Sequence, residues 1–194
     1  MSKTTNKEKI LEAGLALIYK RGYNASGIQD IANEAKVPKG SFYNYFKSKE
    51  IFTTEVIKEY ARVTLQFLKS RLNTGKGKAL ARLKKMLNYW ADTMYSDYDG
   101  CGCLVGNLSQ EMSNQSQEIR TALSENFEEL EACFIKCIEE AKQQEELPQS
   151  TQSPKKIGRF IYNGWQGALI RAKAEGNNKQ LKEYIDFIFK EVLN

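Results

Sequence analysis

Cysteines are the clearest candidates for chemically reactive residues, because the 194-residue chain contains four of them and no histidine. The lack of histidine excludes Ser-His-Asp and Cys-His catalysis, histidine-ligated metals and the commonest general base at neutral pH. An enzyme that uses only Asp, Glu, Lys or Tyr remains open. No apolar signal core follows Met1, so we expect a cytoplasmic protein with reduced thiols.

The segment Cys101-Gly102-Cys103 follows a polar loop, and we expect it to open a helix that contains Leu104 and Leu108. A thiol in the first turn of a helix meets the positive end of the helix dipole, which favours the thiolate. The carboxylates of Asp97 and Asp99 act in the opposite direction. The pattern therefore leaves both a reactive and an inert thiol open.

Cys133 and Cys137 are four residues apart, so they share one helix face with Leu130 and Phe134. Such neighbours indicate small buried hydrophobic residues. A zinc site built from all four cysteines is an alternative, but the C-x-C and C-x3-C spacings differ from those of common zinc knuckles. We therefore expect neither a metal nor another cofactor.

Apolar residues recur at intervals of three and four along nearly the whole chain, and no alternating strand pattern is flanked by turn residues. Thr5 and Glu8 have the T-x-x-E spacing of a capping box, and Gly22 is expected to end the helix that they open. Ser153-Pro154 has the form of an N-cap followed by proline in the first helical position. The sequence predicts an all-α fold of about nine helices and no apolar run that could span a membrane.

Two short helices joined by a tight link are predicted for residues 27–35 and 38–45. We expect the first to bury Ile28 and Ile31, and Val37 to lie between the two helices. Such a pair after a longer helix is typical of a helix-turn-helix, whose second helix enters a major groove about 12 Å wide. A helical hairpin with an ordinary polar surface is the alternative.

The charge distribution suggests a polyanionic partner near the N-terminus, although charge alone favours an ordinary solvated surface. Residues 1–50 carry nine Lys and Arg against five Asp and Glu, whereas residues 101–150 carry three against ten. A basic first segment beside an acidic middle is typical of a chain with two different partners, although a solvated surface has the same composition.

An ordered series of residues makes this N-terminal stretch recognisable. It comprises Gly22-Tyr23, Ile31-Ala32, Val37, Lys39-Gly40-Ser41-Phe42-Tyr43, Tyr45-Phe46 and Lys47-Ser48-Lys49-Glu50. Residues 8–55 thereby resemble the DNA-binding domain of the tetracycline-repressor (TetR/AcrR) family. The resemblance implies a helix-turn-helix DNA-binding domain at residues 1–49 and a helical regulatory and dimerisation domain at residues 50–194.

The resemblance also implies a function. Such proteins are homodimeric transcriptional regulators that bind a near-palindromic double-stranded DNA operator, and a small-molecule or electrophile inducer releases them. We therefore expect a repressor and not an enzyme, with no membrane partner. Two other classes remain open, namely a cytosolic helical thiol or redox protein that uses Cys101 and Cys103, and a small-molecule carrier that does not read DNA.

Carried over residue by residue, the resemblance implies eight DNA contacts. They are Gln29, Lys39, Gly40, Ser41, Tyr43, Asn44, Tyr45 and Lys49. Lys36 stands where the family usually has glycine, so it must adopt a left-handed conformation or reshape the turn. Gly27 stands where Thr or Ser is common, which puts a phosphate contact there in doubt.

A ligand pocket needs apolar walls and a few polar groups, and several large apolar residues on helical stripes are candidates for its lining. They are Trp90, Met94, Leu108, Phe127 and Trp165. Each also suits an ordinary core, and only the family resemblance raises the prospect of a cavity.

Glycines in the helix predicted from about Pro154 to Lys173 weaken it by about 1 kcal/mol each relative to alanine, which suits close approach of another helix. With the last helix, this segment resembles the dimer interface of the family, although close packing within one chain is the alternative. The candidate interface residues are Gly164, Gly167, Ala168, Ile185 and Ile188.

The stretch Gly102-Cys103-Leu104-Val105, followed by Leu108-Ser109, Glu111 and much later Ala172-Lys173, resembles a particular group within the family. These are the electrophile- and oxidant-responsive repressors of the N-ethylmaleimide-repressor type. The resemblance implies that Cys103 is the sensor and that Lys173 is its cationic neighbour, while an inert Cys103 remains the alternative.

Overall fold

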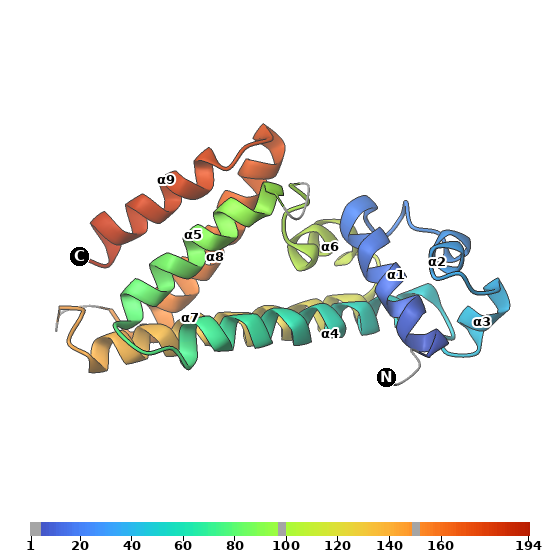
Figure 1. Ribbon diagram of the computed structural model, residues 1–194, viewed down its shortest axis with the longest axis horizontal. Coiled ribbons are helices and arrows are strands. Elements are labelled where there is room, and N and C mark those ends of the chain that lie inside the picture. The colour runs from blue at the N-terminus through green and yellow to red at the C-terminus, as the bar shows by residue number, and fades with distance from the viewer. Residues whose placement is uncertain (1–4, 97–99, 149–151) are drawn as a thin grey trace. The chain divides into compact units, whose positions relative to one another are not determined.

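The computed structural model describes residues 5–96, 100–148 and 152–194, and within these ranges all regular structure is helical. Their nine α-helices, shown in Figure 1, are α1 (Asn6–Arg21), α2 (Ile28–Glu34), α3 (Lys39–Tyr43), α4 (Lys49–Leu68), α5 (Ala79–Ser96), α6 (Leu104–Met112), α7 (Gln117–Gln143), α8 (Pro154–Glu175) and α9 (Lys179–Phe187). Short π-helical turns, Lys69–Asn73 and Ile188–Val192, continue α4 and α9. The predicted all-α fold is confirmed.

The predicted helix ends are also confirmed. Thr5 and Glu8 form a capping box, in which the Glu8 N–H donates to the Thr5 hydroxyl and the Thr5 N–H donates to the Glu8 carboxylate at 2.7 Å. Gly22, with φ of 83°, ends α1. The Ser153 hydroxyl accepts the Lys156 N–H at the start of α8.

The chain forms two compact units. The first comprises Met1–Arg62 with Leu104–Phe127, and the second comprises Val63–Cys103 with Glu128–Asn194. Both α4 and α7 therefore contribute residues to each unit. The predicted boundary between residues 49 and 50 separates a DNA-binding domain from a regulatory and dimerisation domain, and it stays a prediction.

Three phenylalanine rings form the centre of the first unit. The Phe52 ring lies 5.1 Å from that of Phe42 and 4.9 Å from that of Phe46, measured between ring centroids, and all three side chains are buried. A Cβ atom on Gly14 would lie 2.1 Å from the Phe52 ring, so α1 has glycine where this ring fills the space. Burial of each phenylalanine contributes about 1.5–3 kcal/mol to folding.

A second aromatic cluster forms the centre of the second unit. The Trp90 ring lies 5.9 Å from that of Trp165 and 6.5 Å from that of Phe134. Helices α7 and α8 pack closely beside this cluster, since a Cβ atom on Gly158 would lie 2.7 Å from the backbone of Ile135. Such an approach permits no larger residue at Gly158 without a backbone shift.

Candidate functional site

Helices α2 and α3 form a helix-turn-helix in the first unit. Ile31 and Ala32 on α2 and Phe42 on α3 are fully buried. In the link, Lys36 has a φ of 56°, and the N–H of Val37 donates to the carbonyl of Ala32 at 3.0 Å. Lys36 therefore adopts the left-handed conformation that was one of its two predicted options, and the tight turn forms without glycine.

Two details of this motif differ from the prediction. Both helices are shorter than expected, because α2 starts at Ile28 and α3 is only five residues long. Ile28 and Val37 are half-buried rather than buried. Ile28 is the first residue of α2, so no preceding helical turn lies beside its side chain.

The exposed surface of the motif carries most of the predicted DNA-contact residues. Those that are exposed are Gln29, Lys39, Gly40, Tyr43, Asn44 and Tyr45, while Ser41 is half-buried. Tyr43 and Tyr45 are 54% and 45% exposed, so two large rings face solvent. A Cβ atom on Gly40 would meet no atom within 4 Å, so the space beside it is open to another molecule.

Lys49 has a different environment from the other seven residues. Its Nζ donates to the carbonyl oxygen of Tyr23 at 2.5 Å and lies 4.0 Å from the centre of the Tyr23 ring. Burial lowers the pKa of Lys49, and the carboxylates of Glu111, Glu50 and Asp30 oppose that shift. In this arrangement its ammonium group holds the chain between α1 and α2, and its phosphate contact stays a prediction.

A carboxylate from α6 binds the other side of that segment. Glu111 Oε2 accepts the N–H of Tyr23 at 2.8 Å, and Glu111 Oε1 accepts the N–H of Asn24 at 2.7 Å. The Tyr23 hydroxyl donates to Glu50, and burial, followed by the charge of Glu50, raises the pKa of Tyr23 to about 12. Glu111 stands in the stretch that resembles the N-ethylmaleimide-repressor type, but no local pattern predicts this contact, because it joins residues 88 positions apart.

Cys103 directly precedes α6, as the sequence predicts. Its side chain is 9% exposed, Cys101 is half-buried, and Gly102 between them has a φ of 81°. Asp97 and Asp99, which the sequence places upstream, lie outside the described residues. The helix thus starts at Leu104, one residue after the thiol, and the reactivity of Cys103 stays a prediction.

A buried tyrosine that sequence analysis missed lies within electrostatic reach of Cys103. Burial raises the pKa of the Tyr162 hydroxyl on α8, and the charge of Cys103 is the next largest cause. Nothing in the helical stripe distinguishes Tyr162 from an ordinary core residue. Lys173 is exposed in the last turn of the same helix, and its proximity to Cys103 stays a prediction.

The predicted pocket residues divide between the two units. Trp90 and Trp165 belong to the aromatic cluster of the second unit. Leu108 is fully buried on α6, and Phe127 is half-buried on α7, both in the first unit. The side chain of Met94 lies outside the described residues.

Asn126 on α7 is an additional candidate for a ligand contact. It is 2% exposed, and neither its Nδ2 nor its Oδ1 has a hydrogen-bond partner among the described residues. It interrupts a buried apolar stripe that includes Leu123 and Leu130. A buried polar group without a partner costs about 1–3 kcal/mol, and a bound polar molecule would remove that cost.

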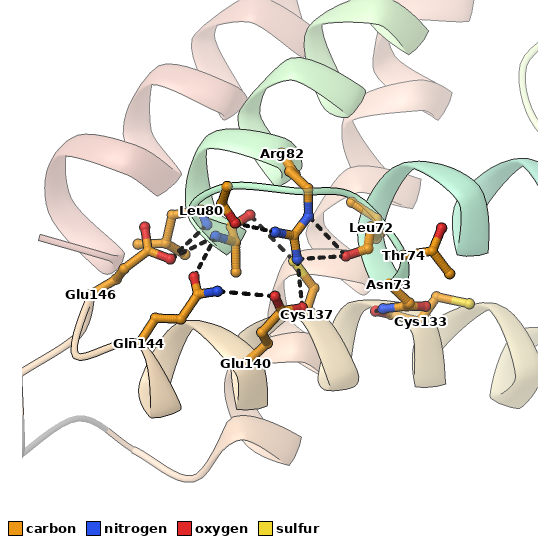
Figure 2. Close-up of polar contacts among 12 residues, drawn as sticks. Leu72, Asn73, Thr74, Leu80, Arg82, Cys133, Cys137, Glu140, Gln144 and Glu146 are labelled. Carbon is orange, nitrogen blue, oxygen red and sulfur yellow. Dashed lines mark hydrogen bonds and ion pairs between the residues drawn. The ribbon is translucent and has the colours of Figure 1, made fainter.

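Arg82 on α5 anchors the link between α4 and α5 to α7, as Figure 2 shows. Its guanidinium group donates to the Leu72 carbonyl at 2.9 Å and pairs with Glu140 at 2.5 Å. The carboxylate of Glu146 accepts the N–H of Ala79, the first residue of α5, at 2.7 Å. These contacts satisfy buried polar groups and indicate a structural role for this region.

Cys133 and Cys137 lie in the same network (Figure 2). The Asn73 side chain donates to the Cys133 carbonyl, and the Cys137 thiol donates to the Ala79 carbonyl. Burial raises the pKa of Cys133, and it raises that of Cys137 to about 12. Across the described ranges no three potential metal ligands cluster together, and no helix there is long and apolar enough to cross a membrane.

Some of the predicted dimer residues are packed within their own chain, and others are exposed. Ile185 and Ile188 are 1% and 0% exposed, and a Cβ atom on Gly164 would lie 2.7 Å from the Tyr184 ring. These three predicted residues therefore pack within their own chain. Gly167 is exposed, and a Cβ atom there would meet nothing within 4 Å.

Apolar side chains also remain exposed on α8 and α9. Phe160 and Ile170 are each 54% exposed, and Phe187 is 55% exposed. Ala168, the fifth predicted residue, is half-buried on α8. Large exposed apolar residues on neighbouring helices are typical of an interaction surface.

The first unit thus defines a helix-turn-helix protein with a polar and aromatic reading surface. Comparison with known proteins agrees with this class. Residues 10–56 match the family described as bacterial regulatory proteins of the tetR family, and residues 79–188 match the tetracyclin repressor-like C-terminal domain. The chain belongs to the tetracycline-repressor family, and it is a DNA-binding transcriptional regulator rather than an enzyme.

Several relatives resemble the chain over most of its length. It is 35% identical to the transcriptional repressor DhaR of Mycobacterium sp. strain GP1, over the whole chain and 95% of the relative. It is 33% identical to the transcriptional regulator AcuR of Cereibacter sphaeroides, over 87% of the chain and 76% of the relative. The crystal structure of reduced Escherichia coli NemR superposes with a TM-score of 0.87, at 26% identity over 98% of both chains.

The environments of the cysteines predict different rates of thiol labelling. At pH 8 a pKa of about 12 leaves only about one in ten thousand Cys137 side chains as the reactive thiolate. We expect N-ethylmaleimide to label Cys101 in the folded protein well before Cys133 or Cys137, as measured by peptide mass spectrometry. Unfolding in denaturant should abolish the difference, and equal labelling in the folded protein would contradict the structural role of Cys137.

Proposed function

We propose that the chain is a cytoplasmic homodimeric repressor that inserts α3 into the major groove of each half of a near-palindromic operator. The observation that carries the proposal is the exposed surface of α3 and of the residue after it, where Lys39, Tyr43 and Asn44 face solvent above a fully buried Phe42. Side chains on such a helix reach base edges and phosphates in the helix-turn-helix docking mode. Membership of the family supports the same mode of binding.

Substitutions on this surface separate base reading from phosphate binding. We expect Tyr43→Ala to weaken binding to all sequences by about 1.5–3 kcal/mol, the range for a hydrogen bond to a charged group. Lys39→Ala and Asn44→Ala should in addition change the preferred operator sequence. Fluorescence anisotropy with a library of duplexes measures both effects, and unchanged operator affinity in a Tyr43→Ala, Lys39→Ala double variant would disprove the assignment.

The dimer interface that we propose uses the exposed side of α8 and α9 rather than their buried side. Phe160, Ile170 and Phe187 supply apolar area, and the open space at Gly167 permits close approach of a partner helix. Ile185 and Ile188 support this surface from beneath, because they fix α9 within its own chain.

A charge introduced into this surface should prevent dimer formation. We expect Ile170→Glu to convert the dimer into a folded monomer and to lower operator affinity by at least about tenfold, since the two half-sites are then bound independently. Sedimentation velocity and anisotropy measure the two effects. Tyr89→Glu, at an exposed aromatic residue on α5, is the control, and an equal loss of dimer there would contradict the proposed surface.

We propose that release from the operator follows the binding of a small molecule or the modification of Cys103. The thiol directly precedes α6. The buried side-chain amide of Asn126, which has no hydrogen-bond partner among the described residues, suits an inducer with a hydrogen-bonding group. Similarity to NemR, whose crystal structure is described as a reduced form, supports thiol modification. Either event can shift binding only if the modified or liganded form favours a conformation with the wrong spacing of half-sites.

An electrophile distinguishes these two means of release. If Cys103 is the sensor, N-ethylmaleimide should lower the operator affinity of the wild type by about 5–150-fold, the usual range of coupling between sites. Cys103→Ser should retain its affinity after treatment, whereas the control Cys101→Ser should lose it as the wild type does. Loss of affinity in Cys103→Ser would contradict a sensor role for this thiol.

A further inference from the structure

The segment between α1 and α2 is held from both sides, although it has no regular structure of its own. On one side Glu111 accepts the N–H groups of Tyr23 and Asn24 at 2.8 and 2.7 Å. On the other side the Lys49 ammonium group donates to the Tyr23 carbonyl at 2.5 Å. Three helices that are distant in sequence, α1, α4 and α6, therefore meet at one peptide segment of the first unit.

Gly22 is required at this point for two independent reasons. Its φ of 83° is unfavourable for residues with a side chain. A Cβ atom would in addition lie 2.8 Å from Glu111 Oε2. The glycine thus admits the carboxylate to the backbone, and a charged acceptor shared by two consecutive amides is a strong and directional contact.

The same segment leads directly into the helix-turn-helix. The Ser26 hydroxyl donates to the Gly22 carbonyl at 2.7 Å, and the Ser26 N–H donates to the Tyr23 carbonyl at 3.2 Å. Ser26 is fully buried, and α2 begins two residues later at Ile28. A displacement of the segment from Gly22 to Ser26 is therefore transmitted to the start of α2.

Helix α6 connects this contact to Cys103. The helix starts at Leu104, directly after the thiol, and Glu111 lies in its last turn. At a rise of about 1.5 Å per residue, the two ends of this nine-residue helix are about 13 Å apart.

We propose that Glu111 is a positioning residue for operator binding, whose carboxylate fixes the helix-turn-helix relative to α6 by holding the Tyr23 and Asn24 amides. It contacts no DNA in this role. Its effect is to set the orientation of the reading helix and hence the separation of half-sites that the dimer accepts. The inference rests on the proposed function, because it needs operator binding as its readout.

Glu111→Gln tests this role with little change in shape. One oxygen acceptor becomes an NH₂ donor, which faces a backbone N–H and cannot bond it. We expect the variant to bind a single half-site duplex as the wild type does. It should lose about tenfold of the wild-type preference for the correct operator over one with an inserted base pair.

Hydrogen exchange provides the readout at the contact itself. The amides of Tyr23 and Asn24 should exchange at least about tenfold faster in Glu111→Gln, while those of α8 remain unchanged. Glu125→Gln, at an exposed carboxylate on α7 of the same unit, is the matched control and should alter neither measurement. Gly22→Ala displaces the carboxylate from the other side and should reproduce the loss of spacing preference if Glu111→Gln fails to fold.

The outcomes separate the two claims. A wild type that binds no operator overturns the proposed function and this inference with it. A wild type that discriminates spacing, together with a folded Glu111→Gln variant that discriminates it equally well, overturns the positioning role alone. Faster exchange at Tyr23 and Asn24 combined with lost discrimination supports it.

Discussion

Helix α3 is too short to be stable alone, so its geometry depends on packing against the rest of the first unit. Isolated helices shorter than about 12–15 residues are marginal in water, and α3 has five residues. Its orientation depends on Phe42, which packs against Phe46 and Phe52 and leaves no exposed surface. The residues that we propose to face DNA are therefore positioned by aromatic packing on the opposite side of the same helix.

A similar dependence on distant contacts is found in the segment that leads into α2. The segment from Gly22 to Ser26 receives a carboxylate from α6 and an ammonium group from α4, and it leads directly into α2. Because α6 begins next to Cys103 and carries Glu111 in its last turn, one short helix joins a candidate sensor to the reading motif. In the release that we propose, the helix-turn-helix keeps its internal structure and only its position changes.

Local features of this structure were predictable from sequence, whereas contacts between distant residues were not. The capping box at Thr5 and the start of α8 at Pro154 depend on neighbours within a few residues, and the left-handed conformation of Lys36 was one of two predicted options. Helical periodicity predicted the all-α architecture, and the resemblance to the family predicted which residues contact DNA. Helical periodicity placed Ile185 on the apolar face of its helix. It cannot distinguish a side chain buried in its own chain from one buried against a partner.

Two polar residues also show that a sequence pattern does not reveal contacts between distant residues. The resemblance implies a DNA contact for Lys49, which stays a prediction, but nothing in the sequence indicates that its ammonium group binds a backbone carbonyl inside the first unit. No pattern in the sequence distinguishes Asn126, and only the fold shows that both of its amide atoms are buried. Footprinting of the reduced protein on the DNA upstream of its own gene, during a salt titration, shows whether the chain binds duplex DNA specifically as a dimer. We expect two protected half-sites about 34–36 Å apart and an affinity that falls steeply with salt. Binding without sequence preference at every salt concentration would rule out specific operator binding by a dimer.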